Sequence, residues 1–132
     1  MDLLSIAKNA ADRAAAASIA SKVPVAVCVV DVHGNLVLHH RMTGAPVFSI
    51  ELSERKAYTS ALVGMRTAEI LPLVPPGQPL FPLSAVSGGR FCAMGGGVPL
   101  TSEGRLVGGV GVSGGTVEQD VAIAEAALRS TN

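Results

Sequence analysis

The amino-acid sequence predicts an α+β fold with two layers: a five-stranded antiparallel sheet, and helices that pack mainly on one of its faces. Three observations lead to this prediction. The chain has 132 residues, so we expect residues 1–132 to form a single domain. Residue patterns give the order helix, two strands, helix, short helix, three strands, helix. Short turns join consecutive strands, which makes the sheet antiparallel.

The first third of the chain contains a helix and a hairpin. Residues 2–21 are rich in alanine and begin with Asp2, a good N-cap, so they predict a helix. Residues 25–32 form an apolar run with one acid near its end, Asp31, and the run is rich in β-branched side chains, which predicts a strand. The turn at 33–35 contains glycine, and the chain returns as a second strand at 36–42.

The middle of the chain contains the second helix and a long loop. Residues 49–65 predict a helix, with Glu51 and Arg55 in the favourable i,i+4 order. Its stripe of small residues indicates close packing on the sheet. Residues 66–74 predict a shorter helix, which prolines end. Residues 75–89 are rich in proline, serine and glycine, and we interpret them as a long loop with apolar anchors that serves as a lid.

The last third contains three strands and a helix. Thr116 and Gln119 form a capping box, which predicts a helix over residues 117–128. The expected strands lie at 90–94, 98–101 and 105–112, with turns at 95–97 and 102–104.

Two glycine-rich segments, 94–100 and 108–115, contain much of the glycine of the chain. Glycine inside a strand marks a bulge or a close approach of another backbone. Two interpretations follow and can both hold: the glycines line the floor of a ligand site, or they let a helix lie flat on the sheet.

Composition excludes several classes of function. Ten basic and ten acidic residues balance, and aromatic residues make up only 3%, so nothing indicates a nucleic-acid partner. No apolar run is long enough to span a membrane and no signal-peptide pattern is visible, so we expect a cytoplasmic protein without a membrane partner. Hydrophobic residues make up 48% and charged residues 15%, which predicts a homo-oligomer larger than a dimer. Cys28 and Cys92 are expected to be buried thiols.

Five short motifs carry a resemblance to a known family. They are Val29-Val30-Asp31 with Gly34, Arg41-Met42 with Gly44-Ala45, Lys56-Ala57-Tyr58-Thr59, Gly95-Gly96-Gly97-Val98-Pro99, and Gly111-Val112-Ser113-Gly114-Gly115 followed by Glu118-Gln119-Asp120. Together they resemble the GlcG/HbpS-like family, which includes the C-terminal domain of PduO-type proteins. The resemblance implies a profilin-like fold, assembly into homo-oligomers that often have eight subunits, and binding of haem or a related tetrapyrrole. No other cofactor is expected.

The sequence departs from that pattern in two places. Thr43 stands where an acidic residue is expected before Gly44-Ala45. The first helix contains no histidine, although it is one place where a family member could supply a haem ligand.

His39 and His40 are the candidate metal ligands. They are adjacent on a strand, so their side chains point to opposite faces and only one of them can be the axial ligand of a haem. The alternative is that they are polar residues near a subunit interface.

Lys56 and Arg41 are the candidate cations of an anion-binding pocket. Lys56 interrupts a helix of small residues near the glycine-rich strands, and a buried lysine needs a partner. Backbone amides of the glycine segments would add donors to a carboxylate or propionate. The alternative is that Lys56 reaches water and Arg41 pairs with an acid. The full candidate ligand site comprises Arg41, Lys56, Gly95, Gly96, Gly97, Pro99, Ser113, Gly114 and Gly115.

Three functions remain open on the sequence alone. The leading one is an oligomeric small-ligand-binding protein for haem, another tetrapyrrole or another anionic small molecule. The second is a cofactor-independent enzyme that acts on a small carboxylated metabolite, with Lys56 or Glu54 as the catalytic group in proton transfer. The third is an assembly module without a ligand.

Overall fold

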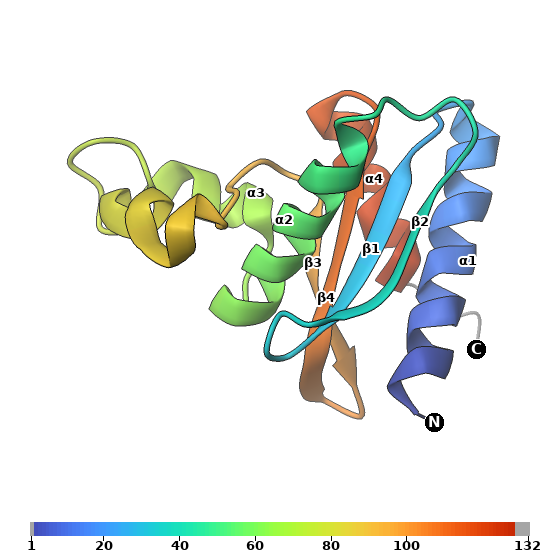
Figure 1. Ribbon diagram of the computed structural model, residues 1–132, viewed down its shortest axis with the longest axis horizontal. Helices are drawn as coiled ribbons and strands as arrows, with labels where there is room; N and C mark the ends of the chain where they lie inside the picture. The colour runs from blue at the N-terminus through green and yellow to red at the C-terminus, as the bar shows by residue number, and fades with distance from the viewer. Residues whose placement is uncertain (1, 129–132) are drawn as a thin grey trace.

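A four-stranded antiparallel sheet forms the centre of the fold (Figure 1). The computed structural model describes residues 2–128. The strands are β1 (Ala26–Asp31), β2 (Leu36–Arg41), β3 (Gly97–Ser102) and β4 (Arg105–Ser113), in the order β2-β1-β4-β3. The central strands are therefore β1 and β4, and the predicted α+β class with an antiparallel sheet is confirmed.

The register of the strands decides which side chains share a face. Val27 of β1 lies opposite Val112 of β4 and opposite His40 of β2. Cys28 lies opposite Gly111 and His39. Because residues directly opposite each other point to the same side of a sheet, the odd-numbered valines of β1 share one face with His40, and Cys28 shares the other with His39.

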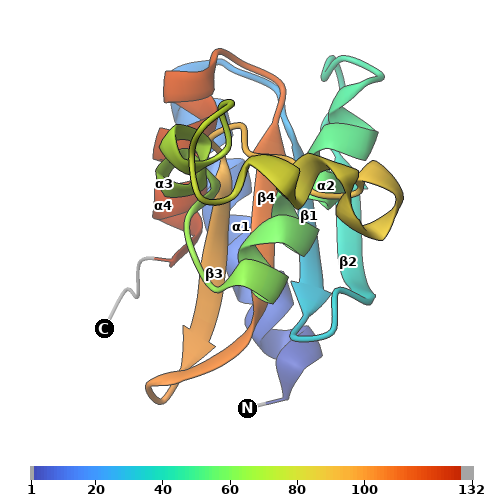
Figure 2. The ribbon, with the colours of Figure 1, turned by 90° about the vertical axis from the view of Figure 1, so that its left-hand side faces the viewer.

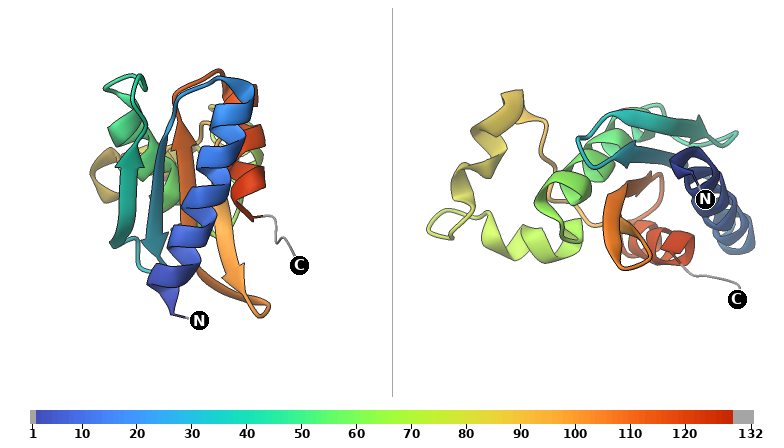
Figure 3. Two further views of the ribbon diagram at one scale, coloured as in Figure 1. Left: turned by 90° about the vertical axis from the view of Figure 1, so that its right-hand side faces the viewer. Right: turned by 90° about the horizontal axis from the view of Figure 1, so that it is seen from below.

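Helices cover both faces of this sheet. The helices α1 (Leu3–Ser21) and α4 (Val117–Leu128) pack on one face, and α2 (Ser49–Val63) packs on the other (Figures 1 and 3). The prediction of two layers with helices mainly on one face is wrong. The physical reason lies in β1, where residues 26–30 are buried whichever face they point to. A strand buried on both faces is apolar throughout rather than alternating.

The ends of the helices follow their capping residues. The Ser5 amide donates to Asp2 Oδ1 at 2.9 Å, so Asp2 is the N-cap of α1. In α4 the Gln119 amide donates to Thr116 Oγ1 and the Thr116 amide donates to Gln119 Oε1, which confirms the capping box. None of the helices within residues 2–128 combines the length and the apolar character that a membrane span needs.

The strand expected at 90–94 does not form, so the prediction of five strands is wrong. The segment passes over the outer side of α2 instead. The Phe91 ring lies 5.3 Å from the Tyr58 ring, and the Cys92 amide donates to Thr59 Oγ1 at 2.8 Å. Its apolar side chains therefore pack on a helix and not beside a strand, and Cys92 is only half-buried.

Residues 66–94, which we call the arm, extend away from the sheet (Figures 1 and 2). The arm contains the short helix α3 (Thr67–Ile70) and the 3₁₀ segments η1 (Leu71–Leu73) and η2 (Phe81–Gly89). The expected short helix over 66–74 is therefore split between α3 and η1. The expected long loop contains the turn before η2 and η2 itself.

Candidate functional site

The glycines of β4 let α2 lie directly on the sheet. A Cβ atom at Gly111 would lie 1.9 Å from the Ser53 carbonyl oxygen, and one at Gly109 would lie 2.4 Å from the Ala57 carbonyl oxygen. No side chain fits in this space. For β4, the structure confirms the interpretation in which glycine allows a helix to approach the strand closely.

This close approach carries Lys56 into the interior. The side chain is only 1% exposed, and Nζ donates to the Val112 carbonyl oxygen at 3.0 Å and to Asp120 Oδ2 at 3.2 Å. The second oxygen of Asp120 accepts a hydrogen bond from the Gly115 amide at 2.9 Å. A Cβ at Gly96 would lie 3.0 Å from Nζ, so glycine at this turn also makes room for the ammonium group.

The Lys56–Asp120 pair joins α2 to α4 at the end of β4. Burial raises the pKa of the Asp120 carboxyl, while the Gly115 amide and the Lys56 ammonium act in the opposite direction. Because both charged groups are out of water, each depends on the other, and removal of one would leave the other unpaired. The pair therefore fixes how the two helices sit across the sheet.

Asp120 is the residue that sequence reasoning missed as the partner of Lys56. A signal was available, because Asp120 falls on the inner stripe of α4 with Ile123, Ala124 and Ala127, all of which are buried. An acid on the buried stripe of a helix needs a cation, and Lys56 was the other charged residue expected among small buried side chains.

The remaining glycine-site candidates pack against neighbouring elements. The Gly97 amide donates to Thr67 Oγ1 at 2.9 Å, and a Cβ at Gly95 would lie 2.8 Å from the Val121 side chain. Ser113 is buried at the end of β4, and Pro99 is half-buried in β3. At Gly114, where φ is 153°, a Cβ would lie 2.4 Å from the Pro24 carbonyl oxygen.

Arg41 lies elsewhere, at the edge of the sheet. It lines an open pocket of about 180 Å³ together with His39, His40 and Ile50. Its Nη1 donates to the Ala45 carbonyl oxygen at 3.2 Å, and the residue as a whole is exposed. Lys56 is not among the residues that line this pocket. The structure thus brings Lys56 together with Gly96 and the end of β4, and it places Arg41 with the two histidines.

The two histidines differ in their surroundings. His39 points toward α2, where its Nε2 lies 3.0 Å from Ser53 Oγ. Burial lowers the pKa of His39, although the charge of the nearby Glu54, a half-buried residue of α2, acts in the opposite direction. His40 points toward the other face, and its Nε2 is buried without a hydrogen-bond partner among the described residues.

The donor set of this pocket limits the metals that suit it. Within residues 2–128, no three His, Cys, Asp or Glu side chains converge on a point where a bare metal ion would be held. Haem iron needs fewer ligands from the protein, because the porphyrin ring supplies four and the protein supplies only one or two. An imidazole beside a guanidinium and the apolar side chain of Ile50 is a set that matches an iron, a propionate and a ring.

Comparison with known proteins gives consistent matches over the whole fold. The family model described as "Haem degrading protein HbpS-like" matches residues 3–129. An uncharacterized 15.0 kDa protein encoded in the dhaT-dhaS intergenic region of Citrobacter freundii is 43% identical over 125 residues, which are 95% of this chain and 88% of that protein. The corrinoid adenosyltransferase PduO of Salmonella typhimurium is 40% identical over 84% of this chain but only 33% of its own length. Among solved structures, a PduOC:haem complex is 35% identical with a TM-score of 0.90, covering 97% of this chain and 92% of the other.

Proposed function

The chain belongs to the HbpS-like family, and we propose that it binds haem or a related tetrapyrrole at the pocket formed by His39, His40, Arg41 and Ile50. The family match agrees with the resemblance that the sequence motifs indicate. A solved relative with 35% identity is a haem complex, which makes a tetrapyrrole the first ligand to test. The observation in this chain that carries the proposal is that one pocket is lined by His39, His40, Arg41 and Ile50, where one of the two imidazoles would lie beside a guanidinium and an apolar side chain.

The residues of the pocket fit the parts of a haem. An imidazole of His39 or His40 would coordinate the iron, Arg41 would pair with a propionate, and Ile50 would contact the ring. Bound haem would supply an iron centre that exchanges electrons or binds small ligands. Pockets that enclose a ligand usually measure about 300–1,000 Å³, so a pocket of about 180 Å³ in one chain covers only part of a tetrapyrrole.

We assign the anionic part of the ligand to Arg41 and not to Lys56. The Lys56 ammonium already has two acceptors inside the protein and almost no exposure. A carboxylate would have to displace Asp120 to reach it. Arg41, in contrast, is exposed, and its guanidinium donates one hydrogen bond to the Ala45 carbonyl oxygen.

Haem titration of the parent protein and of single variants tests this assignment. We expect a Soret shift with the parent that His39→Ala or His40→Ala, but not both, abolishes. Arg41→Gln should weaken binding by roughly tenfold, the value of one charge-assisted hydrogen bond. His33→Ala is the matched control, because His33 is exposed in the β1–β2 turn. A parent without a Soret shift, or a shift that persists in both histidine variants, contradicts the proposal.

We also propose that the protein acts as a homo-oligomer. The family resemblance implies an octamer, so this is the form that we expect. Support within the chain comes from large apolar side chains at the surface, such as Val47 at 77% and Phe48 at 61% exposed. Light scattering at micromolar concentration measures the mass directly. A mass of 13.3 kDa, that of one chain, would contradict it.

A further inference from the structure

A second pocket, of about 250 Å³, lies at the end of the molecule where α1 begins (Figure 1). One of its walls is the first part of α1 and the other is the β3–β4 hairpin, so we call it the hairpin pocket. None of the residues that line it belongs to the pocket of His39 and His40. The proposed function therefore leaves this site without a role.

Part of the hairpin pocket is apolar. Leu3 and Ile6 of α1 and Val107 of β4 line it, and all three are half-buried and pack against the main hydrophobic cluster. A β-bulge at this end of the hairpin leaves Val107 without a partner in β3. Leu106 lines the pocket too and is 40% exposed. The pocket thus offers an apolar group a surface that is backed by the packed interior.

The hairpin adds two opposite charges that the fold does not use. Glu103 and Arg105 both line the pocket, and both are exposed. Within residues 2–128, neither forms an ion pair or a side-chain hydrogen bond. Both side chains are therefore available to a ligand that carries the opposite charge.

The glutamate is not explained by the turn that contains it. Glu103 has a φ of 53° and Gly104 has a φ of 75°, the pair of positive values that a type I′ hairpin turn requires. Asparagine, aspartate or glycine suits the first of these positions, and a longer side chain there is uncommon. The hairpin therefore places a carboxylate at the pocket where its own conformation favours another residue.

We propose that the hairpin pocket binds a free α-amino acid with an apolar side chain. Such a molecule carries a carboxylate, an ammonium group and an apolar group on one carbon atom. Arg105 pairs with the carboxylate, Glu103 pairs with the ammonium group, and Leu3 and Ile6 contact the apolar group. Pockets for drug-sized ligands measure about 300–1,000 Å³, so a pocket of about 250 Å³ suits a molecule of this small size.

Ligands with a single charge fit this pocket less well. A carboxylate alone would be attracted by Arg105 and repelled by Glu103, and an amine alone would meet the reverse arrangement. A residue within a peptide lacks at least one of the two charges. A free amino acid uses both charges and the apolar surface together.

Isothermal titration calorimetry of the full chain with L-leucine tests the proposal. We expect saturable binding of one molecule per chain. Arg105→Gln and Glu103→Gln each remove one charge, and each should weaken binding by roughly tenfold or more. Glu103→Gly removes the same carboxylate and suits the positive φ of the turn, so a lower affinity in this variant does not come from a weaker fold. Lys22→Gln is the matched control, because Lys22 is an exposed cation at the opposite end of α1.

Analogues of L-leucine test the same contacts from the side of the ligand. L-Leucine amide lacks the carboxylate and N-acetyl-L-leucine lacks the ammonium group, so each should bind roughly tenfold more weakly than L-leucine. Glycine lacks the apolar group and should also bind more weakly, because it removes no apolar surface of the pocket from water.

Each outcome decides the proposal. Binding of L-leucine that is weakened by the variants at both positions, and not by Lys22→Gln, supports it. A parent that binds no L-leucine, an Arg105→Gln or Glu103→Gln variant that binds it as tightly as the parent, a Lys22→Gln variant that loses as much affinity, or analogues that bind equally well overturns it. Haem titration of the same samples keeps this inference separate from the proposed function, since the two pockets share no residue and each proposal can fail alone.

Discussion

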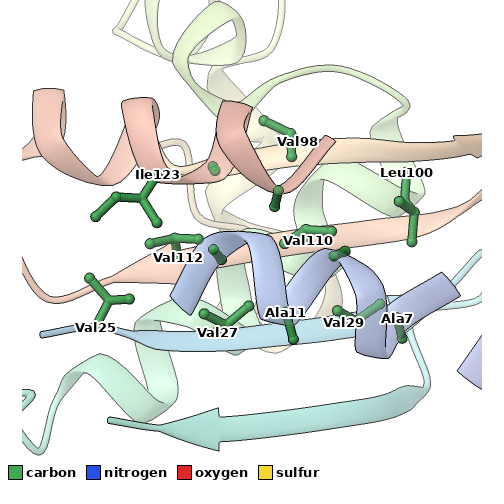
Figure 4. Close-up of a cluster of buried hydrophobic side chains, with 14 residues drawn as sticks. Ala7, Ala11, Val25, Val27, Val29, Val98, Leu100, Val110, Val112 and Ile123 are labelled. Atoms are coloured by element: carbon green, nitrogen blue, oxygen red, sulfur yellow. The ribbon is translucent and has the colours of Figure 1, made fainter. Parts of the chain in front are cut away.

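The two faces of the sheet are held by different forces. Toward α1 and α4, valines of the strands interlock with alanines of the helices in a continuous apolar cluster (Figure 4). Toward α2, the buried apolar cluster within the described residues 2–128 consists of Cys28, Val30, Ala57 and Ala61. Polar groups fill much of the rest of that interface. The Ser60 hydroxyl, for example, donates to the Ala57 carbonyl oxygen at 3.0 Å and lies 3.1 Å from the Val98 carbonyl oxygen.

The sheet therefore holds its helices in two different ways. The valine face gains stability from the apolar area removed from water, at about 25 cal/mol per Å². The α2 face has little apolar area, so it depends on the short distance between backbones and on paired polar groups. Added volume or a lost charge on the α2 face should therefore destabilise the fold strongly. Lost volume on the valine face should destabilise it far less.

Gly111→Ala should cause the largest effect. The added Cβ would lie 1.9 Å from the Ser53 carbonyl oxygen, a backbone atom that moves only if α2 moves. We expect a loss of more than about 4 kcal/mol in the free energy of unfolding, or failure to fold. Urea unfolding followed by circular dichroism measures it.

Val110→Ala is the control for that change, because Val110 is the neighbouring residue of β4 and is fully buried on the valine face. Removal of two methyl groups should cost about 2 kcal/mol. If Gly111→Ala costs no more than Val110→Ala, the two faces do not differ in the way described.

Lys56→Met should cost about 3–5 kcal/mol, because it leaves the Asp120 carboxylate buried without its cation. The double variant Lys56→Met, Asp120→Leu removes both charges and should recover much of the loss. The same urea experiment measures both variants. Equal stability of the single and double variants would mean that the ion pair is not what couples α2 to α4.

The smallest expected effect concerns His39 and pH. Its pKa is lowered from 6.5, mainly by burial, so the unfolded chain binds this proton more tightly than the native protein. The stability contributed by neutral His39 is therefore present above pH 6.5 and is lost as the pH falls below it. Urea midpoints at about pH 7.5 and pH 5.5 measure the difference. His39→Gln should reduce it and His33→Gln should not; the reverse result would assign the effect to another group.

Local signals in the sequence predicted most elements well. The capping box placed the start of α4, the glycine turns placed both hairpins, and the stripe of small residues placed α2 against the sheet. Each of these signals acts over a few residues along the chain. The prediction of two layers did not use one such signal: five successive apolar residues at 26–30 are typical of a strand that is covered on both faces.

Contacts between segments that are far apart in the sequence limited what could be predicted. Residues 90–94 have the composition of a strand, yet Tyr58 and Thr59 of α2 provide their partners. The candidate site has the same limit. The sequence singled out both Lys56 and Arg41, but only the three-dimensional structure separates them, because Lys56 meets Asp120 across 64 positions of the chain. The histidines were placed on opposite faces correctly, since alternation along a strand is local.

The placement of β1 has a consequence for how the chain folds. One of its edges pairs with β2, which follows within a few residues, but the other pairs with β4, so that Val27 meets Val112. During synthesis the apolar β1 therefore has one unpaired edge until most of the chain has been made. Pairing between such distant segments is slow, since a large loop must close first. Until then, the open edge of β1 is the part of the newly made chain most prone to aggregate with another chain.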